Sequence, residues 1–254
     1  MEIRLPRRLM IRQIIESIGN GLYPGEKLPE REKKNRRIPT SVDYEQLRIA
    51  IQYQFLTATT AAEVAGKYRS ISKPLNNAYK INIDGQEAVI FPIKKGRLGE
   101  EDDPIMRAVC LPLNRTYEPW AREVFDYVDA HPDPFCFAED DQRSSRIVQE
   151  TIKYIFNTII WKSEWNIVLP GLDYTPTDKT NFTSQSLYWF RLYLLYNRYN
   201  FTLNDLKAFT GIDDDHKKLV PFEKNEEKAR ELFRNKAESY FHRFTSVNYS
   251  KNDE

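Results

Sequence analysis

Apolar residues recur along most of the chain at the three- and four-residue spacing of amphipathic helices. Thr202 with Asp205 predicts the start of one of these helices, and Gly211 predicts its end. The expected helices are residues 9–18, 42–56, 61–69, 119–130, 142–163, 184–199, 202–211 and 223–244. Residues 166–181, with two prolines and a glycine, are expected to form a loop.

The spacing of apolar residues changes from a helical to a strand pattern between residues 79 and 113. Residues 79–83 alternate between apolar and polar, Asp84-Gly85 is a turn dipeptide, and residues 88–93 are apolar. Residues 107–113 predict a third strand. The sequence therefore predicts a mainly α fold with a small three-stranded antiparallel sheet.

Length and composition allow one large domain with a small appendage. The chain has 254 residues, of which 41% are hydrophobic and 30% are charged, and this is enough to build a core. We expect a basic N-terminal helix and linker over residues 1–40, a main domain over residues 41–244 and a flexible tail over residues 245–254.

Charge is distributed unevenly although the net charge is only +1. Residues 1–40 hold ten Lys or Arg against five Glu, whereas the rest of the chain holds 28 basic against 32 acidic residues. A basic arm of this kind can reach phosphate groups. A solvated linker is the alternative interpretation.

Several classes of protein are disfavoured by what the sequence lacks. It has no apolar run long enough to span a membrane, no typical signal peptide and only two cysteines, Cys110 and Cys136. It also has no phosphate-binding glycine loop and no zinc motif. We therefore expect a cytoplasmic protein with no cofactor, no metal and no membrane contact.

Three stretches carry a family resemblance. Thr57-Ala58-Thr59-Thr60-Ala61-Ala62-Glu63 resembles a T-G-x-R-x-S-E box that enters a helix. Residues 88–95 and 107–112 resemble a β-segment that carries a catalytic lysine. Residues 185–191 resemble an H-x-L-R-H-x-R box, and residues 205–211 resemble a helix that ends in a glycine turn. In order and spacing these features are similar to the catalytic domain of tyrosine recombinases, the phage-type integrases, especially archaeal forms, over about residues 40–225.

The resemblance implies a catalytic site whose residues have been replaced. Family members hold the scissile phosphate with two arginines, move protons with a histidine and a lysine, and attack phosphorus with a tyrosine. On this alignment Lys94 or Lys95 retains the lysine, and Trp189 is retained with it. The other positions hold Thr60 for the first arginine, Gln185 for the histidine, Tyr188 for the second arginine and Phe222 for the nucleophile.

These replacements predict a pseudoenzyme. Threonine and tyrosine cannot neutralise a phosphoryl transition state as guanidinium groups do, and phenylalanine has no attacking oxygen. Tyr240 as a displaced nucleophile is the alternative, in which strand transfer would persist.

A scaffold of this kind could still bind duplex DNA weakly and with strong salt dependence, in an architectural or regulatory role. Such binding would place the protein at the nucleoid. Ordinary solvated charge is the alternative interpretation of the same cations. The candidate DNA contacts are Arg31, Lys33, Lys34, Arg36, Arg37, Lys67, Arg69, Lys73, Lys94, Lys95, Arg97 and Arg191.

Residues 41–254 have a net charge close to zero, which is unusual for a DNA-binding domain. A second hypothesis is therefore that the fold is a protein-interaction module without DNA binding. Aromatic residues between Tyr188 and Tyr199 predict core or interface packing, with base stacking as the alternative. The stripe of Leu232, Phe233, Tyr240, Phe241 and Phe244 within residues 223–244 predicts self-association, unless it packs on its own domain.

Overall fold

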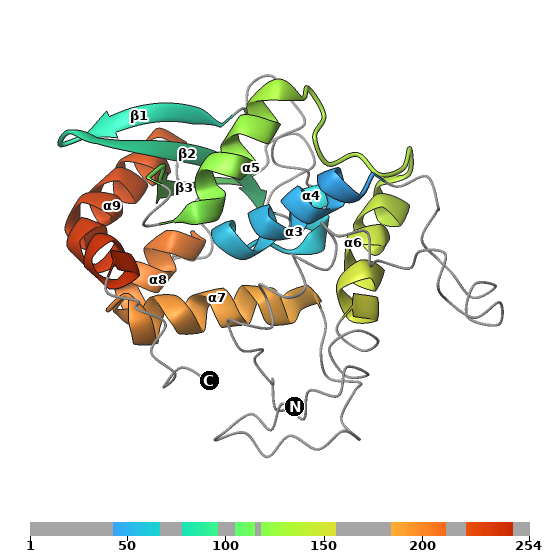
Figure 1. The fold of residues 1–254 in the computed structure, drawn as a ribbon. Coiled ribbons are helices and arrows are strands. Elements are labelled where there is room, and N and C mark those ends of the chain that lie inside the picture. The colour runs from blue at the N-terminus through green and yellow to red at the C-terminus, as the bar shows by residue number, and fades with distance from the viewer. Residues whose placement is uncertain are drawn as a thin grey trace, which may run out of the picture. The chain divides into compact units, whose positions relative to one another are not determined.

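The computed structural model describes residues 43–66, 78–95, 105–114, 118–155, 184–211 and 222–245. These residues are mainly helical and include a three-stranded antiparallel sheet, so the predicted fold class is confirmed at this level (Figure 1). Residues 9–18 and 166–181, with most of the predicted arm and tail, lie outside the described residues. The chain divides into two compact units, Met1–Lys67 with Phe135–Phe190 and Tyr68–Pro134 with Arg191–Glu254.

The first unit is helical throughout its described residues. It contains α3 (Tyr44–Thr57), α4 (Ala61–Ala65), α6 (Asp141–Ile155) and the first part of α7 (Ser184–Arg198). Asp43 begins α3, because its carboxylate accepts a hydrogen bond of 2.9 Å from the backbone N–H of Glu45. The predicted helix over 61–69 is shorter in the structure, since α4 ends at Ala65.

Close packing between α4 and α6 explains the glycine that follows α4. A Cβ atom at Gly66 would lie 2.9 Å from Ala62 Cα and 3.0 Å from Ser145 Cβ, which is too close for another residue. Elsewhere in this unit the Tyr53 and Phe135 rings pack with their centroids 5.4 Å apart. The buried Gln54 amide donates a hydrogen bond of 3.0 Å to the Ser184 carbonyl, which joins α3 to the start of α7.

The second unit contains the sheet, whose strands follow the chain in the order β1 (Tyr79–Ile83), β2 (Gln86–Lys95) and β3 (Ile105–Pro112). Asp84 and Gly85 connect β1 and β2 and both have positive φ, at 52° and 83°. This conformation matches the twist of a two-residue hairpin turn, and it confirms the predicted hairpin. The Asn82 side chain accepts a hydrogen bond of 2.9 Å from Gly85 N and so supports the turn.

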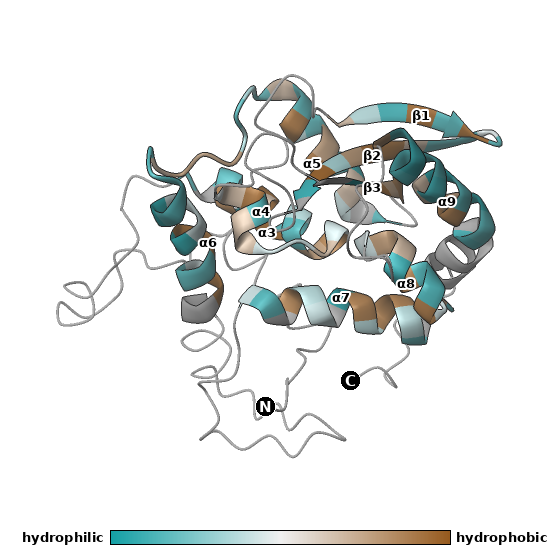
Figure 2. Cartoon of the chain, turned by 180° about the vertical axis from the view of Figure 1, so that it is seen from behind, coloured by the Kyte–Doolittle hydropathy of each residue, from teal (hydrophilic) through white to brown (hydrophobic). Residues whose placement is uncertain are grey.

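Helix α9 (Phe222–Thr245) packs against one face of this sheet. Strand residues that point to this face, Ile83, Ile90 and Cys110, form a buried cluster with Ala229 and Phe233 of α9. Figure 2 shows the contrast between a largely hydrophobic β3 and a largely hydrophilic α9, which buries only a narrow apolar stripe.

Ionic contacts attach α5 (Pro119–Ala130) to its surroundings in the second unit. The Arg122 guanidinium donates a hydrogen bond of 2.6 Å to the Glu87 carboxylate on β2. At the start of α5, the Glu118 carboxylate pairs with Arg191 from α7 at 3.2 Å, and both side chains are buried. A buried pair of this kind constrains geometry more than it adds stability.

Helix α8 (Leu203–Thr210) begins and ends where the sequence predicts. Thr202 and Asp205 form a capping box, with hydrogen bonds of 3.2 Å and 2.7 Å between each side chain and the other residue's N–H. Gly211 ends the helix with φ 64°. A Cβ there would lie 2.9 Å from Arg107 Cβ, and the Arg107 guanidinium donates a hydrogen bond of 2.7 Å to the Phe209 carbonyl.

Lys236 joins α9 to the start of α8. Its ammonium group lies 2.7 Å from the Asp205 carboxylate and donates a hydrogen bond of 2.9 Å to the Asn200 carbonyl. Burial opposes ionisation of Asp205, but the hydrogen bonds from Lys236 and Thr202 outweigh it and lower the pKa of this carboxyl.

Because the pKa of Asp205 is lowered in the folded state, its stabilising contribution is present above pH 3.8, its ordinary pKa, and is lost as the pH falls through the folded value. We therefore expect Asp205→Asn to reduce the free energy of unfolding by about 1 kcal/mol at neutral pH, because it removes the charge that pairs with Lys236. The difference from wild type should disappear in strong acid. Urea unfolding at a series of pH values measures both the loss of stability at neutral pH and its disappearance in acid.

The matched control is Glu227→Gln on the exposed side of α9, where neutralising the carboxylate should have no such effect. A difference between wild type and Asp205→Asn that persists unchanged in strong acid would contradict an ionic role for Asp205.

Candidate functional site

The segment that connects α3 to α4 contains a left-handed residue at the position aligned with the glycine of the first box. Ala58 stands where the box has glycine, and it adopts a left-handed conformation with φ 48° and ψ 58°. Residues other than glycine rarely adopt this conformation. Thr57 on the preceding turn donates a hydrogen bond of 2.7 Å to the Tyr53 carbonyl and lies 3.1 Å from the Thr59 hydroxyl. This turn therefore has the conformation that the glycine of the box would favour.

Thr60, at the position of the first family arginine, is the N-cap of α4. Its hydroxyl accepts a hydrogen bond of 3.3 Å from Glu63 N, and its own N–H donates one of 2.7 Å to the Glu63 carboxylate. The two residues thus form a capping box. The Thr60 side chain therefore caps the start of α4 and carries no charge.

Gln185 and Tyr188 belong to the same unit as Thr60 and lie on α7. Gln185 is exposed, and Tyr188 is partly buried with its ring packed edge-on against Trp189, at a centroid distance of 5.0 Å. These side chains are neutral at ordinary pH, so neither can supply the charge of the arginine that the family has at position 188.

Phe222, at the nucleophile position, begins α9 in the second unit. Its partly buried ring packs against the cluster between α9 and the sheet, together with Tyr79 and Ile81. The ring contributes apolar contact at the position where the family has an attacking oxygen.

Lys94 and Lys95 form the last two pairs of the β2–β3 ladder, opposite Met106 and Ile105. The register places them next to the connection between β2 and β3. Only 9% of Lys94 is exposed, however, so this residue offers little surface to a large partner. The side chain of Lys95 lies outside the described part of the structure.

Arg191 is corrected from a candidate DNA contact to a structural residue. Only 1% of this residue is exposed. Its guanidinium pairs with Glu118 and lies 6.0 Å from the centroid of the Tyr199 ring. A side chain enclosed in this way cannot reach a phosphate without unfolding its surroundings.

The remaining candidate DNA contacts lie outside the described residues, so their DNA contact stays a prediction. They are Arg31, Lys33, Lys34, Arg36, Arg37, Lys67, Arg69, Lys73 and Arg97.

The predicted self-association stripe on the C-terminal helix is also partly corrected. Leu232 and Phe233 are buried within the second unit, and Phe233 belongs to the cluster between α9 and the sheet. These two residues therefore stabilise their own unit. The side chains of Tyr240, Phe241 and Phe244 lie outside the described residues.

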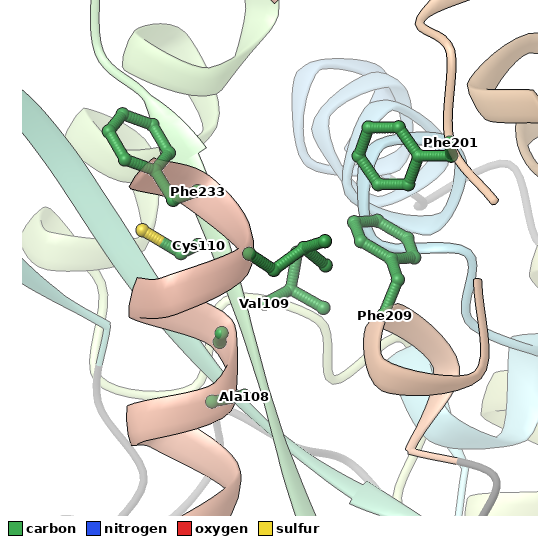
Figure 3. A pocket seen from close by; sticks show the side chains of 8 residues that line it. Ala108, Val109, Cys110, Phe201, Phe209 and Phe233 are labelled. Atoms are coloured by element: carbon green, nitrogen blue, oxygen red, sulfur yellow. The ribbon is translucent and has the colours of Figure 1, made fainter. Parts of the chain in front are cut away.

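A small cavity lies between β3, α8 and α9 in the second unit (Figure 3). It measures about 10 Å³ and is lined only by apolar side chains, among them Val109, Phe201 and Phe209. A space of this size is at the lower limit for one water molecule, and apolar cavities stay dry. Burial also raises the pKa of the adjacent Cys110 thiol, which makes it a poor nucleophile. The cavity is a packing defect.

The exposure of three aromatic residues on α7 corrects part of the sequence prediction. Core packing is wrong for Trp189, Tyr193 and Tyr196, because all three are exposed, and interface packing stays a prediction. The buried residues of this helix are instead Leu187, Arg191, Leu194 and Leu195. The signal was the spacing of the three aromatics, which places them on one face opposite the leucines.

Comparisons with models of protein families, with curated proteins and with solved structures found no match. Among the described residues, no helix is both long and apolar enough to cross a membrane. The same part of the chain contains no group of three or more His, Cys, Asp or Glu residues arranged to hold a metal ion.

The capping role of Thr60 gives a direct test of this geometry. Thr60→Ala removes the hydroxyl that accepts from Glu63 N, and we expect it to lower the free energy of unfolding by about 1 kcal/mol. Thr60→Ser keeps the acceptor and should remain close to wild type. Urea denaturation of the two variants measures the difference, and equal stabilities would contradict the capping role.

Proposed function

We propose that this chain is a catalytically inactive protein with a tyrosine-recombinase-like fold that binds duplex DNA in an architectural or regulatory role. The observation that carries the proposal is the turn over residues 57–63. It has a left-handed residue at the box's glycine position and a capping glutamate at the box's last position. The order of the described elements supports the same proposal, because α3 and α4 precede the three-stranded sheet and further helices follow it.

The inactive state follows from the side chains at the aligned positions. Thr60 caps a helix, Gln185 and Tyr188 are neutral, and Phe222 packs on the sheet. Loss of one preorganised donor to a transition state typically costs about 3–4 kcal/mol. Two missing guanidinium groups and a missing nucleophile would together remove the strand-transfer reaction.

The proposed DNA contacts lie where the chain leaves β2 toward β3. Lys95 is the last residue of β2, and Arg97 follows it in the sequence. The acidic residues 100–103 lie in the same connection and would repel phosphate. We therefore expect weak binding that depends on a few phosphate contacts, with a steep loss of affinity as salt rises.

A protein-interaction module without DNA binding is the second candidate. The burial of Lys94 and Arg191 favours it, because this burial removes two of the candidate phosphate contacts from the surface. The two candidates differ in whether any duplex DNA is bound at low salt.

The test for DNA binding measures fluorescence anisotropy of a labelled duplex over about 50–200 mM salt. We expect wild type to bind at the low end, and the double substitution Lys95→Glu with Arg97→Glu to weaken binding and to reduce the salt slope by about 2. Lys224→Glu is the matched control, since this exposed cation at the start of α9 lies outside the proposed surface.

Absence of wild-type binding at low salt would reject the DNA-binding proposal in favour of the second candidate. Inactivity is tested separately with a suicide duplex that traps a covalent protein–DNA adduct. We expect no adduct. An adduct abolished by Tyr240→Phe would instead establish a displaced nucleophile.

A further inference from the structure

The turn between β1 and β2 presents an Asp-Gly pair to solvent. Asp84 and Gly85 are both exposed, and a Cβ atom at Gly85 would have no other atom within 4 Å. The peptide nitrogen that follows Asp84 therefore has no side chain beside it to shield it from the Asp84 carboxyl group. Asp84-Gly85 is the single Asp-Gly dipeptide of the sequence.

An Asp-Gly pair of this kind can react within its own backbone. The Gly85 nitrogen attacks the Asp84 Cγ atom and loses its proton, one carboxyl oxygen leaves as water, and a succinimide ring forms. Because the two reacting groups belong to adjacent residues, the step needs no second molecule. Water then opens the ring at either carbonyl carbon. One opening restores aspartate, and the other gives isoaspartate, in which the backbone runs through the side-chain CH2 group.

The side chain of Asn82 holds the attacking nitrogen. Its Oδ1 atom accepts a hydrogen bond of 2.9 Å from Gly85 N. The proton in this hydrogen bond is the one that the reaction removes, so the contact must break before the nitrogen can attack Cγ. Asp84 and Gly85 also have the positive φ angles of a two-residue hairpin turn, 52° and 83°, and the hydrogen bond from Gly85 to Asn82 maintains this geometry.

Arg234 of α9 holds the other reacting group. Its Nε atom donates a hydrogen bond of 2.9 Å to Asp84 Oδ2. The ion pair restricts the rotation of the carboxyl group that would bring Cγ toward Gly85 N. The side chains are 56% and 66% exposed, so this restraint is weaker than that of a buried pair.

We propose that Asp84-Gly85 is a site of spontaneous isoaspartate formation, and that Asn82 and Arg234 keep the reaction slow in the folded protein. This inference is independent of DNA binding. Isoaspartate adds one CH2 group to the backbone of a two-residue turn, which disturbs both the register of β1 with β2 and the ion pair with Arg234. A chain modified at this site should therefore unfold at a lower urea concentration.

The proposal is tested by incubating the full chain at physiological temperature and pH. Peptide mapping follows isoaspartate at position 84 and separates it from products of Asn20-Gly21. We expect Asn82→Ala to accelerate its formation by a factor of about 3–10. Arg234→Ala should accelerate it by a factor of about 2–5, whereas Arg234→Lys keeps a cation at this position and should stay closer to wild type.

Two variants serve as matched controls and should age like wild type. Lys224→Ala removes an exposed cation at the start of α9, and Asp205→Asn lowers the stability of the same unit without changing the turn. In concentrated urea, wild type and the variants that keep Asp84-Gly85 should all react at one faster rate, because neither restraint exists in the unfolded chain.

Circular dichroism checks that each variant is folded. If Asn82→Ala is not, Asn82→Val carries the test, because valine also lacks the acceptor and is favoured in strands. Folded wild type that reacts as fast as the chain in urea would overturn the proposal. So would a wild-type rate in a folded variant that lacks either restraint, or equal acceleration in Asp205→Asn.

Discussion

The second unit depends on the contact between α9 and one face of the sheet. Ala229 and Phe233 close over Ile90 and Cys110 and form the buried cluster between α9 and the sheet. Two ion pairs from the middle of α9 then help to align this helix. Arg234 pairs with Asp84 in the hairpin turn, and Lys236 pairs with Asp205 at the start of α8. Hydrophobic burial supplies the larger share of the free energy, and the two ion pairs, one exposed and one largely buried, mainly select the orientation.

Residues at the positions aligned with the recombinase catalytic site have structural roles in this chain. Thr60 begins α4, and Phe222 packs against the cluster between α9 and the sheet. These roles support the proposal of a fold kept without its reaction, because the replaced side chains satisfy local packing and capping.

Local signals in the sequence predicted much of the fold. Asp84-Gly85 predicted the hairpin turn, and Thr202, Asp205 and Gly211 predicted the limits of α8, because these features depend on neighbouring residues alone. The orientation of α7 could not be predicted in the same way, since this helix has large apolar side chains on every side. The burial of Arg191 depends on Glu118, which is 73 residues away, and no local pattern reports such a pairing. The resemblance to recombinases remains a prediction.

Cross-linking is the most direct test of the claim that the aligned positions of the first unit lie close together. Cysteines introduced at Thr60 and at Gln185, both in this unit, would be treated with a short bismaleimide. Cys136 is replaced by serine, and the buried Cys110 should not react. Cysteines at Asp84 and Arg234, whose side chains form an ion pair, provide the positive control. We expect an intramolecular cross-link between positions 60 and 185. Efficient cross-linking of the control pair alone would contradict this claim.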